Sequence, residues 1–334
     1  MKSPCKGEPV LDFEDAISSI TEELREVEAE MAKNLFSEIA MIPTVSRYLI
    51  SSGGKRFRPI LLLLCAHMCG YCGPRAVPLA STVEFIHTAT LLHDDVVDRA
   101  FMRRGLASAN SVWGDGASVL VGDFLFSKSF SLIVKDGNLD ILGVVSEATT
   151  RMAEGEVMQL VKMGNPEITE EDYYFVVTNK TAVLISAACR IGGILGGISP
   201  GEGKALADFG LNLGIAFQLM DDTLDYVSEE ETLGKAIGKD LEEGKITLPL
   251  IHTLQVCSPA EKDRLNRIIK SQDRQEDDLQ FALKVIHERG GVEYTMNRAE
   301  GFVEESKSFL ASFPLSREKE ALAAIADYTV KRKR

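Results

Sequence analysis

Two copies of one acidic pattern, each inside an apolar stretch, limit the structures open to this chain. The pattern DDxxD occupies residues 94–98 and again residues 221–225. On a helix, the first and last aspartate of each copy lie on one face. Like charges at that spacing destabilise a helix by about 0.2–0.5 kcal/mol per pair, so each cluster needs cations. Carboxylate oxygens suit Mg²⁺, which takes its remaining ligands from water and phosphates. Two such clusters facing each other would bind a diphosphate from both sides.

Composition narrows the class of protein. The chain has 334 residues, 45% of them hydrophobic, and no Pro- or Ser-rich linker divides it. This is enough apolar material for one large core. The formal net charge of −13 predicts a surface that repels nucleic acid and anionic membranes. An anionic substrate therefore requires a local basic patch, and we expect no nucleic-acid partner.

The sequence predicts a soluble, cytoplasmic protein. The first residues contain no apolar stretch after their basic residues, which argues against a signal peptide. The most apolar run, residues 60–69, is far shorter than the roughly 20 residues that span a bilayer, so we expect no transmembrane segment. Six cysteines in a chain without a secretion signal are predicted to be free thiols. Those at 65, 69 and 72 have the spacing of an iron–sulfur loop, but they end an apolar helix and are better explained as small core residues.

Hydrophobic periodicity predicts an all-α fold. Apolar residues recur at helical spacing along nearly the whole chain, and alternating strand patterns are scarce. Helix starts are expected at Ser199 and Ser258, where Pro follows Ser and Glu comes three residues later, and more weakly at Thr169. We predict a single-domain bundle of ten or more helices around a deep central cavity. Residues 1–30 are expected to form an N-terminal helix or flexible arm, and residues 31–334 the catalytic domain.

Basic residues flank both acidic motifs. The segment Gly53-Gly54-Lys55-Arg56-Phe57-Arg58-Pro59 precedes the first motif, and its glycines allow close approach to an anion. Arg103-Arg104 follows that motif, and arginine can bond two phosphate oxygens at once. The second half contributes Lys180-Thr181, Gln218, Lys235, Lys239 and Lys245. This is the arrangement expected for two diphosphates bridged by metal.

Together these segments resemble the trans-isoprenyl diphosphate synthases, the polyprenyl synthetase family, and most of all its bacterial octaprenyl-type members. The resemblance runs from about residue 30 to the C-terminus through GGKRFRP, HTATLLHDDVVD, MRRG, GDFLF, EGEVMQL, KTAVL, FQLMDDTLDY and LGKAIGKDLEEGKITLPLI. It implies the isoprenoid synthase fold, a homodimer and three Mg²⁺ ions. The implied reaction joins isopentenyl diphosphate head-to-tail to an allylic diphosphate such as farnesyl diphosphate.

The resemblance also implies residue roles. The main metal ligands would be Asp94, Asp98 and Asp221, supported by Asp95, Asp222 and Asp225. The allylic diphosphate would be held by Arg103, Lys180, Lys235 and Lys245. The diphosphate of isopentenyl diphosphate would be held by Lys55, Arg58, His87 and Arg104. Carbonyls near Lys180 and the side chains of Thr181 and Gln218 would stabilise an allylic cation.

Product length is expected to depend on the residues one turn before the first motif. Side chains lean toward a helix N-terminus, so Ala89 and Thr90 should line the path of the growing tail. Both are small, whereas relatives that stop early carry large aromatic residues there. We expect a product longer than C20, about C40, with a floor formed by Phe124, Phe126 or Phe130. A geranylgeranyl-type C20 product is the alternative.

Two other functions are compatible with an aspartate-rich helical protein. A class I terpene cyclase shares the fold and one metal-binding motif, but it needs neither a second DDxxD nor the Gly-Gly-Lys-Arg segment. A non-catalytic subunit of a heteromeric synthase usually has degraded motifs, and both are intact here. The basic terminus, residues 330–334, is expected to be a solvated end, or alternatively to fold over the mouth of the site.

Overall fold

A computed structural model describes residues 13–227, 238–271 and 274–332. Within these ranges the chain is helical except for loops and one small hairpin, which confirms the all-α prediction. The hairpin pairs β1 (Met102–Arg103) with β2 (Leu106–Ala107) in antiparallel register, so that Arg103 lies opposite Leu106.

The first half of the chain forms eight α-helices among the described residues. Its helices are α1 (Phe13–Ile17), α2 (Thr21–Asn34), α3 (Met41–Ser51), α4 (Phe57–Met68), α5 (Ala76–Val97), α6 (Ala109–Trp113), α7 (Asp115–Asp136) and α8 (Leu139–Lys162), with the 3₁₀ turn η1 (Ser18–Ile20).

The helices of the second half are α9 (Glu170–Val177), α10 (Val183–Leu195), α11 (Pro200–Val227), α13 (Lys239–Glu242), α14 (Leu248–Val256), α15 (Pro259–Lys270), α16 (Glu276–Glu288), α17 (Gly291–Phe309) and α18 (Arg317–Lys331). They pack among those of the first half, as α10 does against α4 and α8 and α18 does against α1 and α4. A π-helical turn η2 (Thr178–Ala182) joins α9 to α10, and a 3₁₀ turn η3 (Leu310–Ser312) follows α17.

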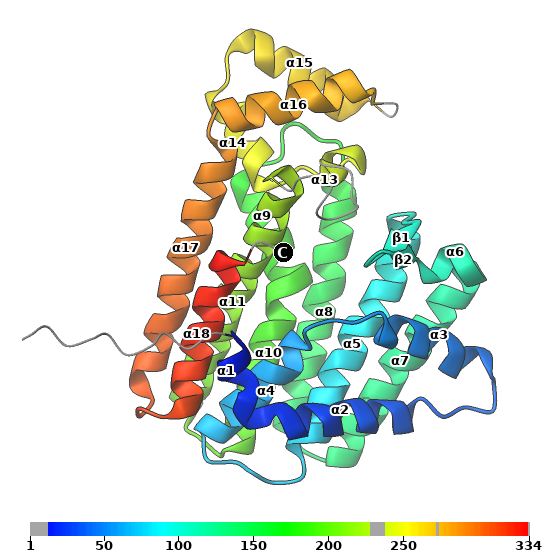
Figure 1. The fold of residues 1–334 in the computed structure, drawn as a ribbon, viewed down its shortest axis with the longest axis vertical. Helices are drawn as coiled ribbons and strands as arrows, with labels where there is room; N and C mark the ends of the chain where they lie inside the picture. The colour runs from blue at the N-terminus through cyan, green and yellow to red at the C-terminus, as the bar shows by residue number, and fades with distance from the viewer. Residues whose placement is uncertain (1–12, 228–237, 272–273, 333–334) are drawn as a thin grey trace, which may run out of the picture.

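The long helices run side by side along the molecule's long axis (Figure 1). Helix α5 packs against α4 and α7, α10 packs against α4, α8 and α11, and α11 packs against α17. Helix α2 crosses the lower end of this bundle, and α15 and α16 lie across the upper end (Figure 1). The buried apolar residues form two clusters, the larger around α4, α5 and α10 and the smaller around α9, α14 and the C-terminal half of α11.

Reciprocal capping begins three helices where the sequence predicts. Ser258 accepts from the backbone N–H of Glu261 while the Glu261 carboxylate accepts from the Ser258 N–H, and Pro259 occupies the first turn. The same exchange occurs between Ser199 and Glu202. Thr169 makes it with Asp172. These caps satisfy N–H groups that the helix itself leaves unpaired, which is why the local pattern predicts the boundaries.

The described part of the N-terminal segment, from residue 13 onward, packs as part of the bundle. Ile20, Val27 and Met31 are fully buried in the larger cluster. Helix α2 continues to Asn34, so the expected division at residue 30 falls inside a helix. Residues 1–12 lie outside the described residues.

Two helical stretches, Asp115–Asp136 and Glu170–Leu195, are long and apolar enough to cross a membrane by length and composition alone. Most of the apolar window in Glu170–Leu195 is buried inside the protein. Because core helices of soluble proteins meet the same criteria, these stretches are weak evidence for a membrane span. The first of them, α7, leaves much of its apolar surface exposed.

Candidate active site

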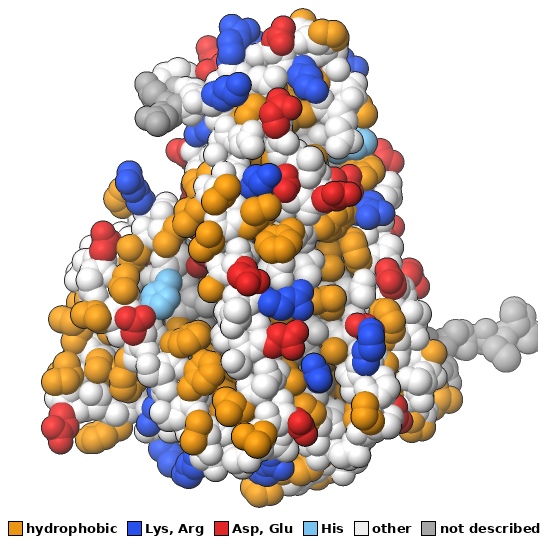
Figure 2. Space-filling view, turned by 180° about the vertical axis from the view of Figure 1, so that it is seen from behind, with side chains coloured by type: hydrophobic (Ala, Val, Ile, Leu, Met, Phe, Trp, Pro, Cys, Tyr) orange, Lys and Arg blue, Asp and Glu red, His pale blue; other side chains and the backbone are white. Residues whose placement is uncertain are grey.

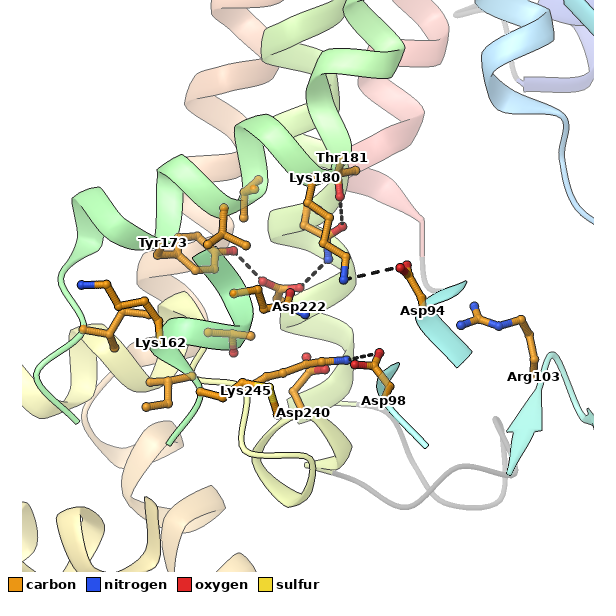
Figure 3. Close-up of a pocket in the computed structure, with 18 residues that line it drawn as sticks. Asp94, Asp98, Arg103, Lys162, Tyr173, Lys180, Thr181, Asp222, Asp240 and Lys245 are labelled. Carbon is orange, nitrogen blue, oxygen red and sulfur yellow. Dashed lines mark hydrogen bonds and ion pairs between the residues drawn. The ribbon is translucent and has the colours of Figure 1, made fainter. Parts of the chain in front are cut away.

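The two acidic motifs face one another across a cavity inside the helical bundle. The first lies at the C-terminal end of α5 and the second near the C-terminal end of α11. Two lysines reach across to the first motif (Figure 3). Lys180 Nζ lies 3.8 Å from Asp94 Oδ2, and Lys245 Nζ lies 2.7 Å from Asp98 Oδ2. The predicted clustering of carboxylates with cations from the second half of the chain is therefore present.

Two cavities meet at this point. A cavity of about 1050 Å³ extends from the first motif along α5 and α8 toward α18, and one of about 230 Å³ lies between the motifs and α9. The residues that line both are Asp94, Arg103, Lys180, Thr181 and Gln218. The larger cavity provides room for a substrate next to the charged site.

The aspartates of the first motif differ in their surroundings. Burial raises the pKa of Asp94 to about 6, against the opposing effect of Lys180. Asp95 is fully buried, and Arg103 donates from Nε to its Oδ1 over 2.6 Å. Its pKa is raised by burial despite this arginine. Asp94 thus faces both cavities, while Asp95 holds Arg103 in place.

Asp222 of the second motif is a buried hydrogen-bond acceptor. The Tyr173 hydroxyl donates to its Oδ2 over 2.6 Å, and Gln218 Nε2 donates to its Oδ1 over 2.7 Å (Figure 3). Burial raises the pKa of Asp222 to about 7 in spite of both donors. The Gln218 carbonyl oxygen in turn accepts from the Thr181 hydroxyl over 3.0 Å. This chain of hydrogen bonds fixes the orientation of the Gln218 amide.

The outer members of the second motif have partners from distant parts of the chain. Asp221 lines the larger cavity and pairs with Arg332 over 2.7 Å. Asp225 accepts from the backbone N–H of Asp240 over 3.0 Å. Burial, followed by the charges of Asp222 and Asp225, raises the pKa of Asp240 well above its ordinary value.

A π-helical turn presents Lys180 and Thr181 to the site. It interrupts the helix between α9 and α10, and such interruptions are frequent at functional sites. Helix α8 approaches closely, since a Cβ on Gly155 would lie 2.6 Å from the backbone nitrogen of Lys180. The next residue, Glu156, bonds Lys180 Nζ over 2.5 Å. The wide turn and the small residue together aim Lys180 at Asp94.

Lys245 is bound between carboxylates. Burial alone would lower its pKa, but Asp98 and Glu243 together raise it above its ordinary value, so the ammonium is fully charged. Asp98 Oδ1 is buried and has no hydrogen-bond partner among the described residues. It is therefore a carboxylate oxygen available to another ligand.

A separate wall of the larger cavity is basic, and it is lined by Lys55, Arg58 and Arg104 together with His87. Arg58 Nε is buried without a hydrogen-bond partner in the part of the chain that is described. Burial lowers the pKa of Arg58 to about 10, and it remains charged at neutral pH. Burial, with Arg58 beside it, holds the pKa of His87 well below its ordinary value, so the imidazole is neutral. An anion would find donors here that the protein itself does not use.

The proposed chain-length residues lie in different surroundings. Thr90 and Phe126 line the larger cavity. Ala89 is fully buried in the larger apolar cluster, and it is absent from the described cavity lining, as are Phe124 and Phe130. The ring of Phe130 contacts that of Phe126, with centroids 5.3 Å apart. Lys235 lies outside the described residues.

The expectation of a solvated C-terminal end is wrong for Arg332. Its side chain is only 8% exposed and stacks over the Phe217 ring at 3.9 Å. Its guanidinium pairs with Asp221 and donates to the Phe217 carbonyl over 2.8 Å. Arg332 instead lines the larger cavity, in agreement with the alternative that this end of the chain folds over the mouth of the site. Tyr173, Glu156 and Glu84 were also not predicted, because no local pattern distinguishes them from ordinary helix residues.

The donor set fits magnesium. Among the described residues, no group of three or more His, Cys, Asp or Glu is close enough to hold a metal by itself. The motifs nevertheless present hard oxygen donors, including the unpartnered Asp98 Oδ1. This suits an ion that keeps several waters and completes its coordination with substrate phosphates. Asp94, Asp98 and Asp221 are the residues that would hold it.

Comparisons with known proteins agree with this site. The family model described as Polyprenyl synthetase matches residues 39–286. The octaprenyl diphosphate synthase of Escherichia coli is 43% identical over 321 residues, covering 96% of this chain and 99% of that protein. A decaprenyl diphosphate synthase structure from Rhodobacter capsulatus has a TM-score of 0.92 and 42% identity, covering 96% of this chain and 99% of its own.

A third similar structure is a polyprenyl synthase from Caulobacter crescentus in complex with calcium and isoprenyl diphosphate. It has a TM-score of 0.93 and 38% identity, covering 99% of this chain and 100% of its own. The helical fold and paired motifs define a class of all-α prenyltransferases. The chain belongs to the polyprenyl synthetase family and is a trans-prenyl diphosphate synthase of the long-chain type.

The buried carboxyls predict a pH-dependent stability in metal-free buffer. The pKa of Asp222 is about 7 in the folded protein and 3.8 ordinarily, so between these values the folded state binds more protons than the unfolded state. The unfolding free energy should therefore fall as pH rises from about 4 to about 7. Urea denaturation at several pH values, with a chelator present, measures this slope.

The variant Asp222→Asn should reduce that slope, leaving the contributions of Asp94 and Asp240. Asp263→Asn, at an exposed aspartate of α15, is the matched control and should leave it unchanged. An equal slope in wild type and Asp222→Asn would contradict the prediction.

Proposed function

We propose that this protein is a Mg²⁺-dependent synthase that joins isopentenyl diphosphate head-to-tail to an allylic diphosphate. The observation that carries the proposal is the pair of opposed carboxylate motifs with Lys180 and Lys245 reaching between them. The neighbouring cation-lined wall and large cavity support a second diphosphate and a hydrocarbon tail. Farnesyl diphosphate is the proposed allylic primer.

The two diphosphates are assigned to different walls. Arg103, Lys180 and Lys245 border the motifs and would bind the allylic diphosphate, with Lys235 as a further proposed contact. Lys55, Arg58, His87 and Arg104 would bind the diphosphate of isopentenyl diphosphate. The neutral His87 would act as a hydrogen-bonding group there, beside the charged arginines.

Catalysis follows from where charge develops. Bound Mg²⁺, three ions by resemblance to the family, would supply positive charge at the departing diphosphate. Lys180, Lys245 and Arg103 hold that diphosphate as the allylic C–O bond breaks, and they stabilise its growing negative charge. The double bond of isopentenyl diphosphate attacks the resulting carbocation, and the proton that is lost passes to the released diphosphate.

Side chains beside the reacting carbon stabilise the cation. The Gln218 amide is oriented by Asp222 and Thr181, so its dipole is fixed before the bond breaks. Fixed dipoles of this kind cost no reorganisation in the transition state. Apolar residues of the larger cavity exclude water that would otherwise trap the carbocation.

The competing functions explain less of the structure. A class I terpene cyclase has no second substrate, so the wall of Lys55, Arg58 and Arg104 would have no purpose. A non-catalytic subunit would not need both motifs intact with lysines facing the first. Incubating the protein alone with farnesyl diphosphate and labelled isopentenyl diphosphate distinguishes these alternatives, because only a synthase incorporates the label.

Exposed apolar residues support a homodimer. Figure 2 shows apolar side chains scattered over one face of the molecule. Helices α7 and α8 and the turn between them expose Leu120, Val134, Leu139, Val157, Leu160 and Val161. Monomeric proteins rarely leave such a surface uncovered. The proposed location of this dimer is the cytoplasm.

If a second copy of the chain covers this surface, light scattering should give twice the mass of one chain. Leu120→Glu together with Val161→Glu should shift the mass to that of one chain, because carboxylates without partners would be buried at the interface. Val256→Glu, at an exposed apolar residue of α14, is the control and should leave the dimer intact. A wild-type protein of single-chain mass would contradict the proposal.

Metal dependence gives a direct test of the mechanism. Chelation should abolish incorporation of labelled isopentenyl diphosphate, and Mg²⁺ should restore it. Asp94→Ala and Asp221→Ala should each lower kcat by about 100-fold or more, because charge on the leaving diphosphate loses its stabilisation. Asp263→Ala is a remote control and should keep wild-type turnover. Normal turnover in chelator or in both motif variants would refute the proposal.

Chain length should depend on the residues that line the larger cavity. We propose a product of about C40, with C20 as the alternative. Thr90→Phe should shift products to shorter chains, because an aromatic ring would block the path near the motif. Phe126→Ala should lengthen them by removing the proposed floor. Phe124→Ala, on the same helix but off the described cavity lining, is the matched control. Reverse-phase chromatography of the products measures the shift, and unchanged mixtures in both cavity variants would contradict the assignment.

A further inference from the structure

A buried carboxylate lies within the cation-lined wall. Glu84 of α5 lines the larger cavity beside Lys55, Arg58 and Arg104, yet it is only 5% exposed. Burying a carboxylate costs several kcal/mol unless it is paired. Beside a site for a diphosphate, its negative charge would also repel the ligand. Its presence there therefore requires a structural reason.

The partner of Glu84 is Arg56, the first arginine of the Lys-Arg-Phe-Arg segment, which lines the same cavity. Arg56 Nη1 lies 3.2 Å from Glu84 Oε1, and its side chain is 11% exposed. Its Nη2 donates to the Ile50 carbonyl over 2.8 Å. Its Nε reaches Glu28, an exposed residue of α2, at 3.4 Å. Through these contacts, Arg56 links the start of α4 to α5, to α2 and to the end of α3.

The backbone at Arg56 is held in an uncommon conformation. Its φ is +49°, in the left-handed region that residues other than glycine adopt at a cost. Arg56 immediately precedes α4. Its backbone conformation therefore sets the direction of the chain between Lys55 in the loop and Arg58 in the first helical turn. The contacts of the Arg56 side chain with α5 and α3 stabilise that turn.

Arg104 is connected to the same loop. Its guanidinium passes so close to Gly54 that a Cβ there would lie 2.9 Å from Nη1. A displaced loop would therefore move Arg104 as well as Lys55 and Arg58. Burial lowers the pKa of Arg58 and that of Arg104, and the negative charge of Glu84 opposes this lowering at both residues.

We propose that Glu84 is a positioning residue for the isopentenyl diphosphate subsite, acting through Arg56 on Lys55, Arg58 and Arg104. This rests on the proposed function. Glu84 does not bind the substrate itself. It holds the arginine that sets the loop, and the loop supplies the cations that bind the diphosphate.

Positioning and simple electrostatics predict opposite results for Glu84→Gln. Removing a negative charge beside an anion site should strengthen anion binding by Coulomb attraction alone. If Glu84 positions the loop, the same change should weaken binding, because Arg56 loses its buried partner. The glutamine has nearly the same shape, so packing is preserved.

The experiment uses the full chain with Mg²⁺ and farnesyl diphosphate, and measures KM for each substrate separately. Glu84→Gln should raise KM for isopentenyl diphosphate by about 10-fold or more, the loss typical of a buried charge pair, and leave KM for farnesyl diphosphate within about twofold. Glu28→Gln removes the other, exposed carboxylate beside Arg56 and should leave both values unchanged, as expected for exposed pairs. Arg56→Gln should reproduce Glu84→Gln, and the double variant should add little to either.

Unchanged or tighter binding of isopentenyl diphosphate by Glu84→Gln, measured by calorimetry, would overturn the proposal. So would an equal loss for both substrates in Glu84→Gln and Arg56→Gln, because that would show damage beyond this subsite. A wild-type protein that neither binds nor incorporates isopentenyl diphosphate would instead refute the proposed function. Circular dichroism melts of each variant identify any that does not fold, and the other member of the pair then gives the result.

Discussion

The arrangement of the site depends on cations that offset the charge of buried carboxylates, which face each other across the bundle. Asp94, Asp222 and Asp240 are all held in surroundings where burial disfavours their charged form. Lys180 and Lys245, brought in by separate segments, offset part of this charge. The close approach of α8 at Gly155 and the π-helical turn at Lys180 both serve this balance. These cations come from other elements and lie where α5 and α11 bring their carboxylates to the same cavities.

Adjacent aspartates within each motif have different tasks, which the spacing alone does not show. Asp94 faces the cavities, whereas its neighbour Asp95 is buried and holds Arg103. In the second motif, Asp221 lines the larger cavity, while Asp222 accepts from Tyr173 and Gln218. The second aspartate of each pair therefore orients a residue that lines both cavities, Arg103 or Gln218, and we propose that metal ligation by Asp95 and Asp222 is less direct than that by Asp94 and Asp221.

Local chemistry explains what could be predicted from the sequence. Capping residues such as Ser258 act within one turn, so helix starts follow from short patterns. The 3.6-residue repeat likewise places Asp94 and Asp98 on one face without knowledge of the fold. The pairing of Arg332 with Asp221 and of Glu84 with Arg56 depends on how distant helices pack. No property of the 330–334 segment distinguishes a solvated end from one that stacks on Phe217, and the family resemblance, rather than periodicity, identified His87 and Lys245.

In the proposed reaction, the two walls assigned to diphosphates differ in charge, and this difference matches the different roles of the two substrates. The wall proposed for isopentenyl diphosphate has Lys55, Arg58 and Arg104 against Glu84, whose charge is matched by Arg56. It can bind an anion without a metal. The opposite wall combines Lys180, Lys245 and Arg103 with two carboxylate clusters. A diphosphate bound there would also need divalent cations, which would supply positive charge at the departing group. In the proposed reaction the metals therefore act on the allylic substrate, whose C–O bond breaks to a delocalised cation, and isopentenyl diphosphate keeps its own diphosphate.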